Sequence, residues 1–256
     1  MAAIKGAAGV SLGNILGSNV ANIGLVLGAS ALFRPLSVDK KLIRREIPYM
    51  IGASGVFWAI CMDGRVGRLD GIILLAGLAF FLIWGILTAK EDNQLGIKDT
   101  VIKKPRMSFC IGMILVGLAG LVMGANLIVR AAIFIARQFG LSEVFIGLSI
   151  VAVGTSLPEL ATSVVAGIKG EHDISIGNVV GSNVFNVCMV IGTIGLFNPL
   201  PVEKTLNQFE FPVMFLLSIT LFIFARYGKN LGRIKGLFFL SSFFSYIGIS
   251  YLLAIK

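Results

Sequence analysis

The chain contains two copies of one sequence segment, placed 164 residues apart. Residues 1–50 align without gaps to residues 165–214, and 24 of the 50 aligned positions are identical. The most similar stretch reads AAIKGAAGVSLGNILGSNVAN in the first copy and AGIKGEHDISIGNVVGSNVFN in the second. A repeat of this kind indicates that one structural unit is used twice. Any fold for this chain must therefore contain two equivalent units.

Apolar runs separated by charged clusters fill most of the chain. Hydrophobic residues make up 56% of the sequence and charged residues only 14%, whereas soluble domains carry about 25% charged residues. This composition excludes a disordered chain, a secreted disulfide scaffold and an ordinary cytosolic enzyme. A bilayer core needs about 20 apolar residues per helix. The predicted membrane spans are residues 10–33, 46–62, 69–89, 108–129, 143–168, 173–197, 209–226 and 234–254.

The position of the repeat within these spans predicts its orientation. Five predicted spans separate the two copies, and an odd number means that the copies enter the membrane from opposite sides. Inverted repeats of this kind are typical of secondary transporters, whose ion or substrate site lies near the midplane where the copies meet. We therefore predict an all-α polytopic membrane protein with an incomplete first half at 1–89, a connecting loop at 90–107 and a complete second half at 108–256.

The distribution of basic residues predicts which side faces the cytoplasm. When the loops alternate across the membrane, fifteen Lys and Arg residues fall on one side and seven on the other. The positive-inside rule then places the 90–107 loop in the cytoplasm and the C-terminus outside. This topology explains the net charge of +9 without a nucleic-acid partner. Cys61, Cys110 and Cys188 lie in apolar runs and indicate neither disulfides nor a zinc site.

Glu159 is the acidic residue that lies in the middle of a predicted span, 143–168. A carboxylate at the bilayer centre costs about 2.5–3.5 kcal/mol on insertion scales and indicates an ion or proton site by default. Pro158 lacks an N–H, so the Gly154 carbonyl loses its helical partner and the helix is predicted to break near GTSLP. Thr155 shares a helical face with Glu159. Hydroxyl, carbonyl and carboxylate oxygens suit Na⁺ and Ca²⁺; a protonated structural Glu and a kink without function are the alternatives.

Each copy of the repeat also carries a polar stripe with a spacing of four residues, which puts its members on one helical face. Small and amide residues also pack and hydrogen-bond membrane helices, so packing alone is the alternative interpretation. Two symmetric stripes that face one site favour ion ligation. Asn126, in the middle of another span, is interpreted as a packing residue. The stripes are Asn178, Ser182 and Asn186 in the second copy and Asn14, Ser18 and Asn22 in the first.

These motifs resemble a known transporter family. GTSLPE followed by GNVVGSNVFN is similar to the second alpha-repeat signature of the sodium/calcium exchanger family, in the cation/calcium antiporter superfamily, and GNILGSNVAN is similar to the tail of the first. The resemblance covers essentially the whole chain, from the end of the family's second span to its tenth. It implies a ten-span fold in two inverted halves of five helices, about eight spans of which this chain holds.

The family resemblance also implies an activity and a location. It implies exchange of Ca²⁺ against Na⁺, or in some branches H⁺ or K⁺, by a transporter that is not an enzyme and has no cofactor. The expected partners are the lipid bilayer and the two ions, with no nucleic acid and no obligatory protein partner. The short 90–107 connection favours a small prokaryotic member in the plasma (inner) membrane.

The resemblance further implies a set of ligands. Glu159 corresponds to the central carboxylate, and the other positions supply hydroxyl, amide or backbone carbonyl oxygens. Some family members have Asp where Asn186 stands, so the missing charge leaves the co-substrate open. The implied ligands are Glu159, Thr155, Ser156, the backbone of Ala152, Ser182, Asn186, Ser18 and Asn22.

The first copy lacks one part of the family pattern. The family's first repeat also carries GTSLPE, and with the 164-residue offset its Glu would fall six residues before Met1. The chain thus resembles a member truncated within the first alpha-repeat, with one site carboxylate in place of two. Two unit charges 4 Å apart interact by about 4 kcal/mol at an effective dielectric of 20. We therefore expect the 256-residue chain alone to exchange Ca²⁺ poorly.

Two other classes of function remain open from the sequence. An H⁺/cation antiporter or an organic-solute carrier could use the same Glu159. A non-transporting fragment or membrane subunit is the other alternative, because the first-repeat Glu is missing. The single histidine, His172, lies in a predicted loop, and no Ser/His/Asp set or phosphate-binding loop is visible.

Overall fold

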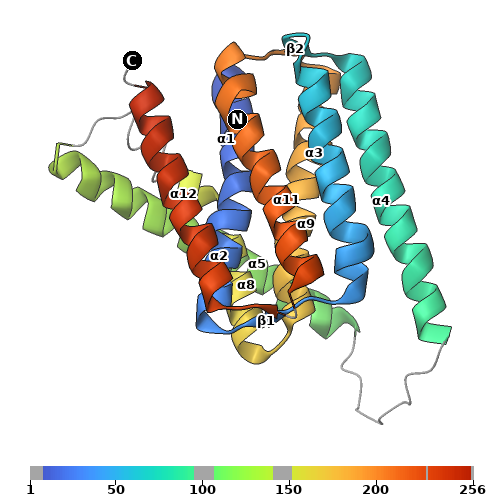
Figure 1. Ribbon diagram of the computed structural model, residues 1–256. Coiled ribbons are helices and arrows are strands. Elements are labelled where there is room, and N and C mark those ends of the chain that lie inside the picture. Colours follow the sequence, from blue (N-terminus) through green and yellow to red (C-terminus); the bar gives the residue numbers. More distant parts are fainter. Residues whose placement is uncertain (1–7, 95–106, 141–151, 229, 255–256) are drawn as a thin grey trace.

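A computed structural model describes residues 8–94, 107–140, 152–228 and 230–254 as a bundle of long helices, with α5 running obliquely across it (Figure 1). In chain order, with η marking π-helical segments, the elements are α1 (Ala8–Ala21), η2 (Asn22–Leu27), α2 (Gly28–Phe33), β1 (Leu36–Ser37), η3 (Leu42–Glu46), α3 (Ile47–Cys61), β2 (Arg65–Val66), α4 (Arg68–Gln94), α5 (Met107–Gln138), α7 (Ala152–Thr155), α8 (Leu157–Lys169), α9 (His172–Phe185), η5 (Asn186–Ile191), α10 (Gly192–Phe197), β3 (Leu200–Pro201), η6 (Leu206–Glu210), α11 (Phe211–Tyr227), β4 (Asn230–Leu231) and α12 (Arg233–Ala254).

The sequence repeat is also a structural repeat. The five successive elements α1, η2, α2, β1 and η3 have bounds that all recur 164 residues later, in α9, η5, α10, β3 and η6. β1 pairs with β4 at one end of the bundle, and β3 pairs with β2 at the opposite end (Figure 1). Equivalent elements therefore lie at opposite ends, and the two copies run in opposite directions, as predicted. The number of five helices per half stays a prediction.

Two short strand pairs join the halves, and no pattern in the sequence indicated them. Both pairs are antiparallel, with Leu36 opposite Leu231 in one and Val66 opposite Leu200 in the other. All four of these apolar side chains are at most 1% exposed. Each pair therefore closes one end of the bundle and buries a side chain from each half. Strands of two residues are too short to produce an alternating pattern in the sequence.

The described helices include six of the eight predicted spans as candidate membrane crossings, and the predicted span 46–62 is not one of them. Six helical segments are long and apolar enough to cross a membrane: Leu12–Phe33, Arg68–Thr88, Met107–Gln138, His172–Phe197, Leu206–Tyr227 and Arg233–Leu253. The predicted span 46–62 is helical as α3 but begins earlier, in η3. The predicted span 108–129 continues to Gln138, because apolar residues follow Arg130. Of the predicted span 143–168, residues 143–151 lie outside the described part.

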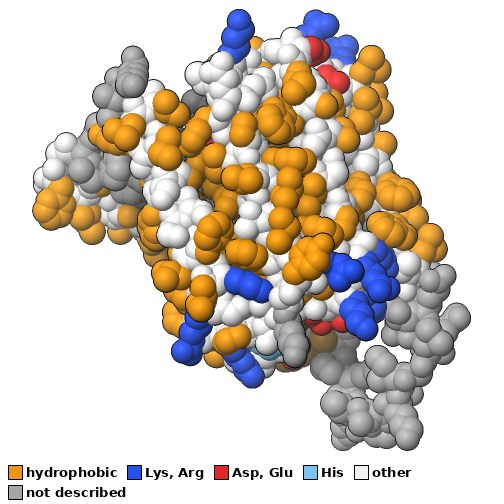
Figure 2. All heavy atoms as spheres, in the orientation of Figure 1, with side chains coloured by type: hydrophobic (Ala, Val, Ile, Leu, Met, Phe, Trp, Pro, Cys, Tyr) orange, Lys and Arg blue, Asp and Glu red, His pale blue; other side chains and the backbone are white. Residues whose placement is uncertain are grey.

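The surface matches a membrane environment. Hydrophobic side chains cover the middle of the visible face, and Lys and Arg gather toward the two ends (Figure 2). The β1–β4 pair brings the segments that begin at Arg34 and at Arg226 to the same end of the bundle. The charge count predicted the same grouping. Residues 95–106, which make up most of the predicted cytoplasmic loop, lie outside the described part.

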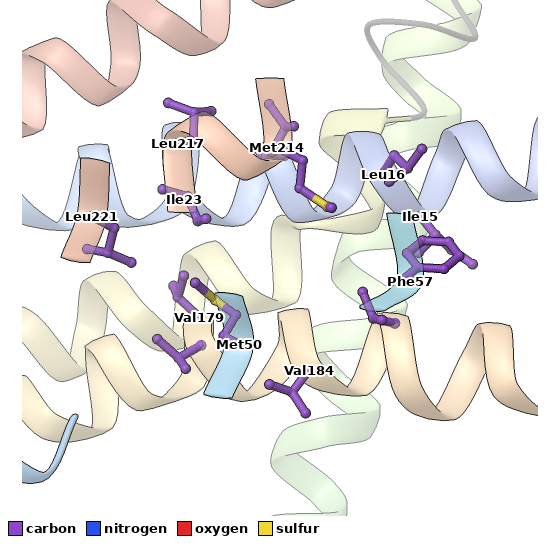
Figure 3. Close-up of a cluster of buried hydrophobic side chains, with 14 of the residues drawn as sticks. Ile15, Leu16, Ile23, Met50, Phe57, Val179, Val184, Met214, Leu217 and Leu221 are labelled. Atoms are coloured by element: carbon purple, nitrogen blue, oxygen red, sulfur yellow. The ribbon is translucent and has the colours of Figure 1, made fainter. Parts of the chain in front are cut away.

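The two repeat copies form the centre of the bundle. In the most apolar stretch of α1–α2, 78% of residues are buried, and in that of α9–α10 50%, against 17% in that of α4 and none in that of α5. Leu16, Ile23 and Met50 from the first copy and Val179, Val184 and Met214 from the second belong to one cluster of buried hydrophobic side chains (Figure 3). The polar stripes of both copies therefore sit on the most enclosed helices.

Glycines permit the closest helix crossings. A Cβ added at Gly71 of α4 would lie 2.6 Å from the Gly192 carbonyl oxygen and 2.6 Å from the Leu196 nitrogen of α10. At the equivalent crossing in the other half, a Cβ on Gly28 of α2 would lie 3.0 Å from the carbonyl oxygen of Gly236 in α12. Backbone atoms cannot move aside as a flexible side chain can. The outer helices therefore depend on glycine to pack on the inner ones.

Replacing Gly71 with Leu is expected to separate α4 from α10. Overpacking typically costs about 1–3 kcal/mol, which lowers the melting temperature of a chain of this size by about 2–10 °C. Thermal unfolding of the purified protein in detergent measures this change. Gly85→Leu on the same helix is the matched control, because a Cβ at Gly85 meets no atom within 4 Å. Equal melting temperatures for the two variants would contradict the packing argument.

Candidate cation site

The helix that carries Glu159 is broken where the sequence predicted. α7 ends at Thr155, and α8 begins at Leu157 with Pro158 in its first turn. Between them Ser156 has φ −99° and ψ 5°, outside the helical range. Its amide donates to the Val153 carbonyl at 3.0 Å, which is a tighter turn than an α-helix makes. Such a break is tolerated at membrane depth only inside protein or beside a water-filled cavity.

Glu159 lies in the first turn of α8, next to this break. The side chain is half-buried, and its Oε2 is buried without a hydrogen-bond donor from the described residues. A buried acceptor left unpaired costs about 1–3 kcal/mol, and more for a charged group. The positive end of the α8 dipole favours negative charge at this position. The carboxylate is therefore oriented so that one oxygen remains available to a cation.

Hydroxyl and amide groups connect the break to both repeat copies. Ser18 Oγ lies 3.4 Å from Ser156 Oγ, and the Asn186 amide Nδ2 donates to Ser18 Oγ at 3.4 Å. Asn22 is 1% exposed, and its Oδ1 is buried without a donor from the described residues. Its own Nδ2 donates to Asn183 Oδ1 at 3.0 Å. The structure thus brings predicted ligands from α1, η2, η5 and the α7–α8 break into one connected polar region.

Three other predicted ligands, Ala152, Thr155 and Ser182, are placed by their positions on α7 and α9. Ala152 is the first residue of α7, so its backbone lies one turn before the break. Thr155 is the last residue of α7 and is exposed, whereas Ser182 is half-buried on α9. These positions are compatible with ligation, and their roles stay predictions.

Two residues of the predicted stripes have other surroundings. Asn178 donates to Ser163 Oγ at 3.0 Å and to the Glu159 backbone carbonyl at 3.4 Å, so it holds α9 against α8. Its counterpart Asn14 is exposed. Asn178 therefore fits the packing interpretation, and the ligand role fits only part of each stripe.

Two polar residues outside the stripes are also placed by the structure. Asn126 is exposed on α5, and His172 begins α9 with its side chain half-buried.

Asn19 and Asn183 were missed by the sequence reasoning. Both are at most 1% exposed, and both hydrogen-bond to predicted ligands. A spacing of three residues from Asn22 and from Asn186 would have placed them on the ligand faces. The sequence reasoning grouped residues by a spacing of four only and did not consider the spacing of three.

Each of the two asparagines predicted as ligands, Asn22 and Asn186, also begins a π-helical segment. η2 starts at Asn22, and η5 starts at Asn186. Short π-helical segments inside α-helices often occur at functional sites. The wider turn appears at the same place in both copies, which indicates that it belongs to the repeated unit. The sequence offered no signal for it.

The available donors restrict the type of cation. Within the described residues, no three His, Cys, Asp or Glu side chains come close enough to hold a metal ion. Glu159 with serine and asparagine oxygens is instead a hard, all-oxygen set, which suits Na⁺ and Ca²⁺ rather than transition metals. A hollow of about 670 Å³ between α5 and α8 and another of about 420 Å³ beside Glu46 contain none of the predicted ligands. The candidate cation site is therefore identified from the oxygen atoms that meet there, and not from a cavity.

Comparison with known proteins decides the family. The profile of the family described as sodium/calcium exchanger protein matches residues 1–87 and 109–252. The chain belongs to the sodium/calcium exchanger family. It is 36% identical over 260 residues to the putative antiporter CaxA of Alkalimonas amylolytica, which covers 98% of this chain and 81% of that protein. It is 27% identical over 273 residues to the sodium/calcium exchanger MaX1 of Methanosarcina acetivorans, covering 92% and 78%.

Solved structures of the exchanger family share this fold. The sodium-calcium exchanger NCX_Mj, soaked with 10 mM Na⁺ and 10 mM Sr²⁺, matches with a TM-score of 0.80 at 33% identity, covering 96% of this chain and 78% of that one. The predicted all-α membrane transporter fold is confirmed, and the chain is a multi-pass membrane protein of a cation/calcium antiporter family. Exchangers transport ions and are not enzymes in the catalytic sense.

Proposed function

We propose that this chain exchanges Ca²⁺ for Na⁺ across the membrane, at a site centred on Glu159. The observation that carries the proposal is the buried Oε2 of Glu159, which has no donor from the described residues and lies at a helix break that contacts the first repeat copy through Ser156 and Ser18. A membrane carboxylate left in this state is best explained by a cation that occupies its free oxygen. The family membership and the NCX_Mj structures soaked with Na⁺ and Ca²⁺ or Sr²⁺ support the same pair of ions.

One site shared by two ions accounts for coupling. Glu159, Ser156, Ser18, Asn22 and Asn186 offer oxygens to either ion. Both are hard cations, and Ca²⁺ takes six to eight oxygen ligands, some of which can be backbone carbonyls or waters. Because both ions need the same carboxylate, each binds only after the other leaves. Competition of this kind makes transport an exchange.

The inverted repeat provides a route for access from both sides. Two halves of opposite orientation can interchange their conformations, so that the site opens first to one side and then to the other. The polar network lies between the copies, at the centre that both halves share. This arrangement supports alternating access around a fixed ion site. The inferred location is a prokaryotic plasma (inner) membrane, in agreement with the relative named inner membrane protein YrbG of Escherichia coli (strain K12), 32% identical over 253 residues.

Uptake of ⁴⁵Ca²⁺ into proteoliposomes loaded with Na⁺ tests the proposal. We expect uptake when Na⁺ is inside and choline outside, and none when K⁺ or choline replaces the internal Na⁺. A pH gradient in place of the Na⁺ gradient identifies an H⁺/cation antiporter. Uptake that follows the pH gradient and ignores Na⁺ would contradict the proposed exchange.

A second preparation tests the expected weakness of a single carboxylate. The chain is extended at its N-terminus by a segment that carries a second GTSLPE sequence, copied from residues 107–164 of the same chain, so that the copied Glu lies six residues before Met1. We expect the extension to increase the Na⁺-dependent uptake. Equal uptake with and without the extension would show that Glu159 suffices alone. Absence of Na⁺-dependent uptake in both preparations would favour a non-transporting fragment.

A further inference from the structure

Two buried asparagines form a symmetric pair of hydrogen bonds with the proposed ligands. Asn186 Nδ2 donates to Asn19 Oδ1 at 2.9 Å, and Asn22 Nδ2 donates to Asn183 Oδ1 at 3.0 Å. Asn19 and Asn183 are equivalent in the repeat, as are Asn22 and Asn186. Each ligand asparagine is therefore held by the partner asparagine of the opposite copy. The two bonds cross between the halves at the centre of the bundle.

Each of the partner asparagines, Asn19 and Asn183, also donates a hydrogen bond to a methionine sulfur. Asn19 Nδ2 donates to Met214 Sδ at 3.6 Å, and Asn183 Nδ2 donates to Met50 Sδ at 3.7 Å. Met50 and Met214 are again repeat equivalents, and they lie on opposite copies in the apolar core (Figure 3). Asn183 Nδ2 also donates to the Asn19 backbone carbonyl at 3.2 Å. The same chain of three side chains thus occurs twice.

The chemistry of each chain fixes its direction. A thioether sulfur only accepts hydrogen bonds, so the NH₂ of the partner asparagine faces the methionine and its Oδ1 faces the ligand asparagine. The ligand asparagine must then present its NH₂ to that oxygen. Its own Oδ1 is left for the ion site, and for Asn22 this oxygen is buried without a donor from the described residues. An amide turned the other way would present N–H groups to the cation.

We propose that Asn19 and Asn183 are positioning residues that hold the amide oxygens of Asn186 and Asn22 toward the transported cation. This inference rests on the proposed function, because it requires a cation at the Glu159 site. Partners that orient metal ligands typically affect metal affinity by 10- to 100-fold when they are removed. The partner asparagines therefore act through the ligands and do not touch the ion themselves.

Two substitutions at Asn19 separate orientation from packing. Asn19→Leu keeps similar volume but removes the acceptor for Asn186, and Asn19→Asp keeps the acceptor oxygen. The half-saturating Ca²⁺ concentration for Na⁺-driven uptake is measured for each, after gel filtration confirms a folded protein. We expect Asn19→Leu to raise it about 10- to 100-fold and Asn19→Asp to leave it unchanged or lower it. A packing role alone predicts the reverse order, because a buried unpaired carboxylate is more disruptive than leucine.

A double-mutant cycle tests the pairing itself. If Asn19 acts only through Asn186, then Asn19→Leu combined with Asn186→Ala weakens Ca²⁺ affinity no further than Asn186→Ala alone. Asn19→Leu combined with Asn22→Ala is the matched comparison, because that ligand is held by Asn183. In this double variant we expect the fold-losses of Ca²⁺ affinity from the two single substitutions to multiply. The mirrored cycle, Asn183→Leu with Asn22→Ala or with Asn186→Ala, gives the same test if Asn19→Leu does not fold.

The outcomes are distinguishable. Absence of Na⁺-driven Ca²⁺ uptake both from the wild-type chain and from its N-terminally extended form would contradict the proposed function and this inference together. Active wild-type protein with unchanged Ca²⁺ affinity in Asn19→Leu and Asn183→Leu would contradict the inference alone. Multiplying effects in the Asn19–Asn186 cycle would also overturn it.

Discussion

Replacing Glu159 with Gln is expected to abolish Na⁺-driven Ca²⁺ uptake and to weaken Ca²⁺ binding at least about 100-fold, or about 2.7 kcal/mol. Glutamine keeps the shape of the side chain but removes the charge and turns one oxygen into an NH₂ group. Unit charges 4 Å apart interact by about 4 kcal/mol at an effective dielectric of 20, and a divalent ion doubles this before desolvation. Isothermal titration with Ca²⁺ in detergent and ⁴⁵Ca²⁺ uptake in proteoliposomes measure the two effects.

Controls distinguish loss of the site from loss of the fold. Glu203→Gln removes the same charge at an exposed position after β3, and we expect it to bind Ca²⁺ as the wild type does. Glu159→Asp keeps the charge on a shorter side chain and is expected to fall between Glu159→Gln and the wild type. The Glu159→Gln protein is expected to have a melting temperature no lower than that of the wild type, because glutamine removes the charge of a carboxylate whose Oε2 is buried without a donor from the described residues. Unchanged Ca²⁺ affinity in a folded Glu159→Gln protein would disprove the site.

Replacing Asn186 with Asp is expected to tighten Ca²⁺ binding about tenfold or more. The substitution adds a carboxylate to a region in which the described residues supply Glu159, and a divalent ion gains more from it than Na⁺ does. Asn186 is half-buried between Ser18 and Asn19, so the new charge lies within the polar network. Na⁺ competition curves at fixed Ca²⁺ measure the change in preference.

Asn14→Asp is the matched control for that gain. It adds the same charge to the corresponding stripe of the first copy, but at an exposed position one helical turn before Ser18. We expect Ca²⁺ affinity in this variant to stay within about twofold of the wild type, because exposed charges are well screened. A gain as large in Asn14→Asp as in Asn186→Asp would mean that overall charge, and not the site, sets the affinity.

Much of the architecture could be predicted because the repeat and the apolar runs are properties of the sequence itself. The 164-residue shift predicted equivalent elements, and α1 and α9 have corresponding bounds. The odd number of intervening spans predicted the inverted orientation. The helix break at Ser156 followed from Pro158 alone, because a missing N–H acts locally and needs no tertiary context.

The details that depend on contacts between the halves could not be predicted. The β1–β4 and β2–β3 pairs involve two residues per strand and form only when the bundle closes. The π-helical starts at Asn22 and Asn186 have no local signal. The spacing of four residues grouped Asn178 with Asn186, whereas the structure uses Asn178 to pack α9 on α8. Helical spacing identifies a face but not which of its members meet a partner.

Soaking the protein with Sr²⁺, a heavier stand-in for Ca²⁺, and locating the ion by anomalous diffraction tests the central claim most directly. We predict one strong peak at a Glu159 carboxylate oxygen, at a distance slightly longer than the about 2.3–2.6 Å that Ca²⁺ takes, with Asn22 and Asn186 Oδ1 facing it. Excess Na⁺ is expected to displace the peak. An ion bound away from Glu159, or one that Na⁺ leaves in place, would contradict exchange at this site.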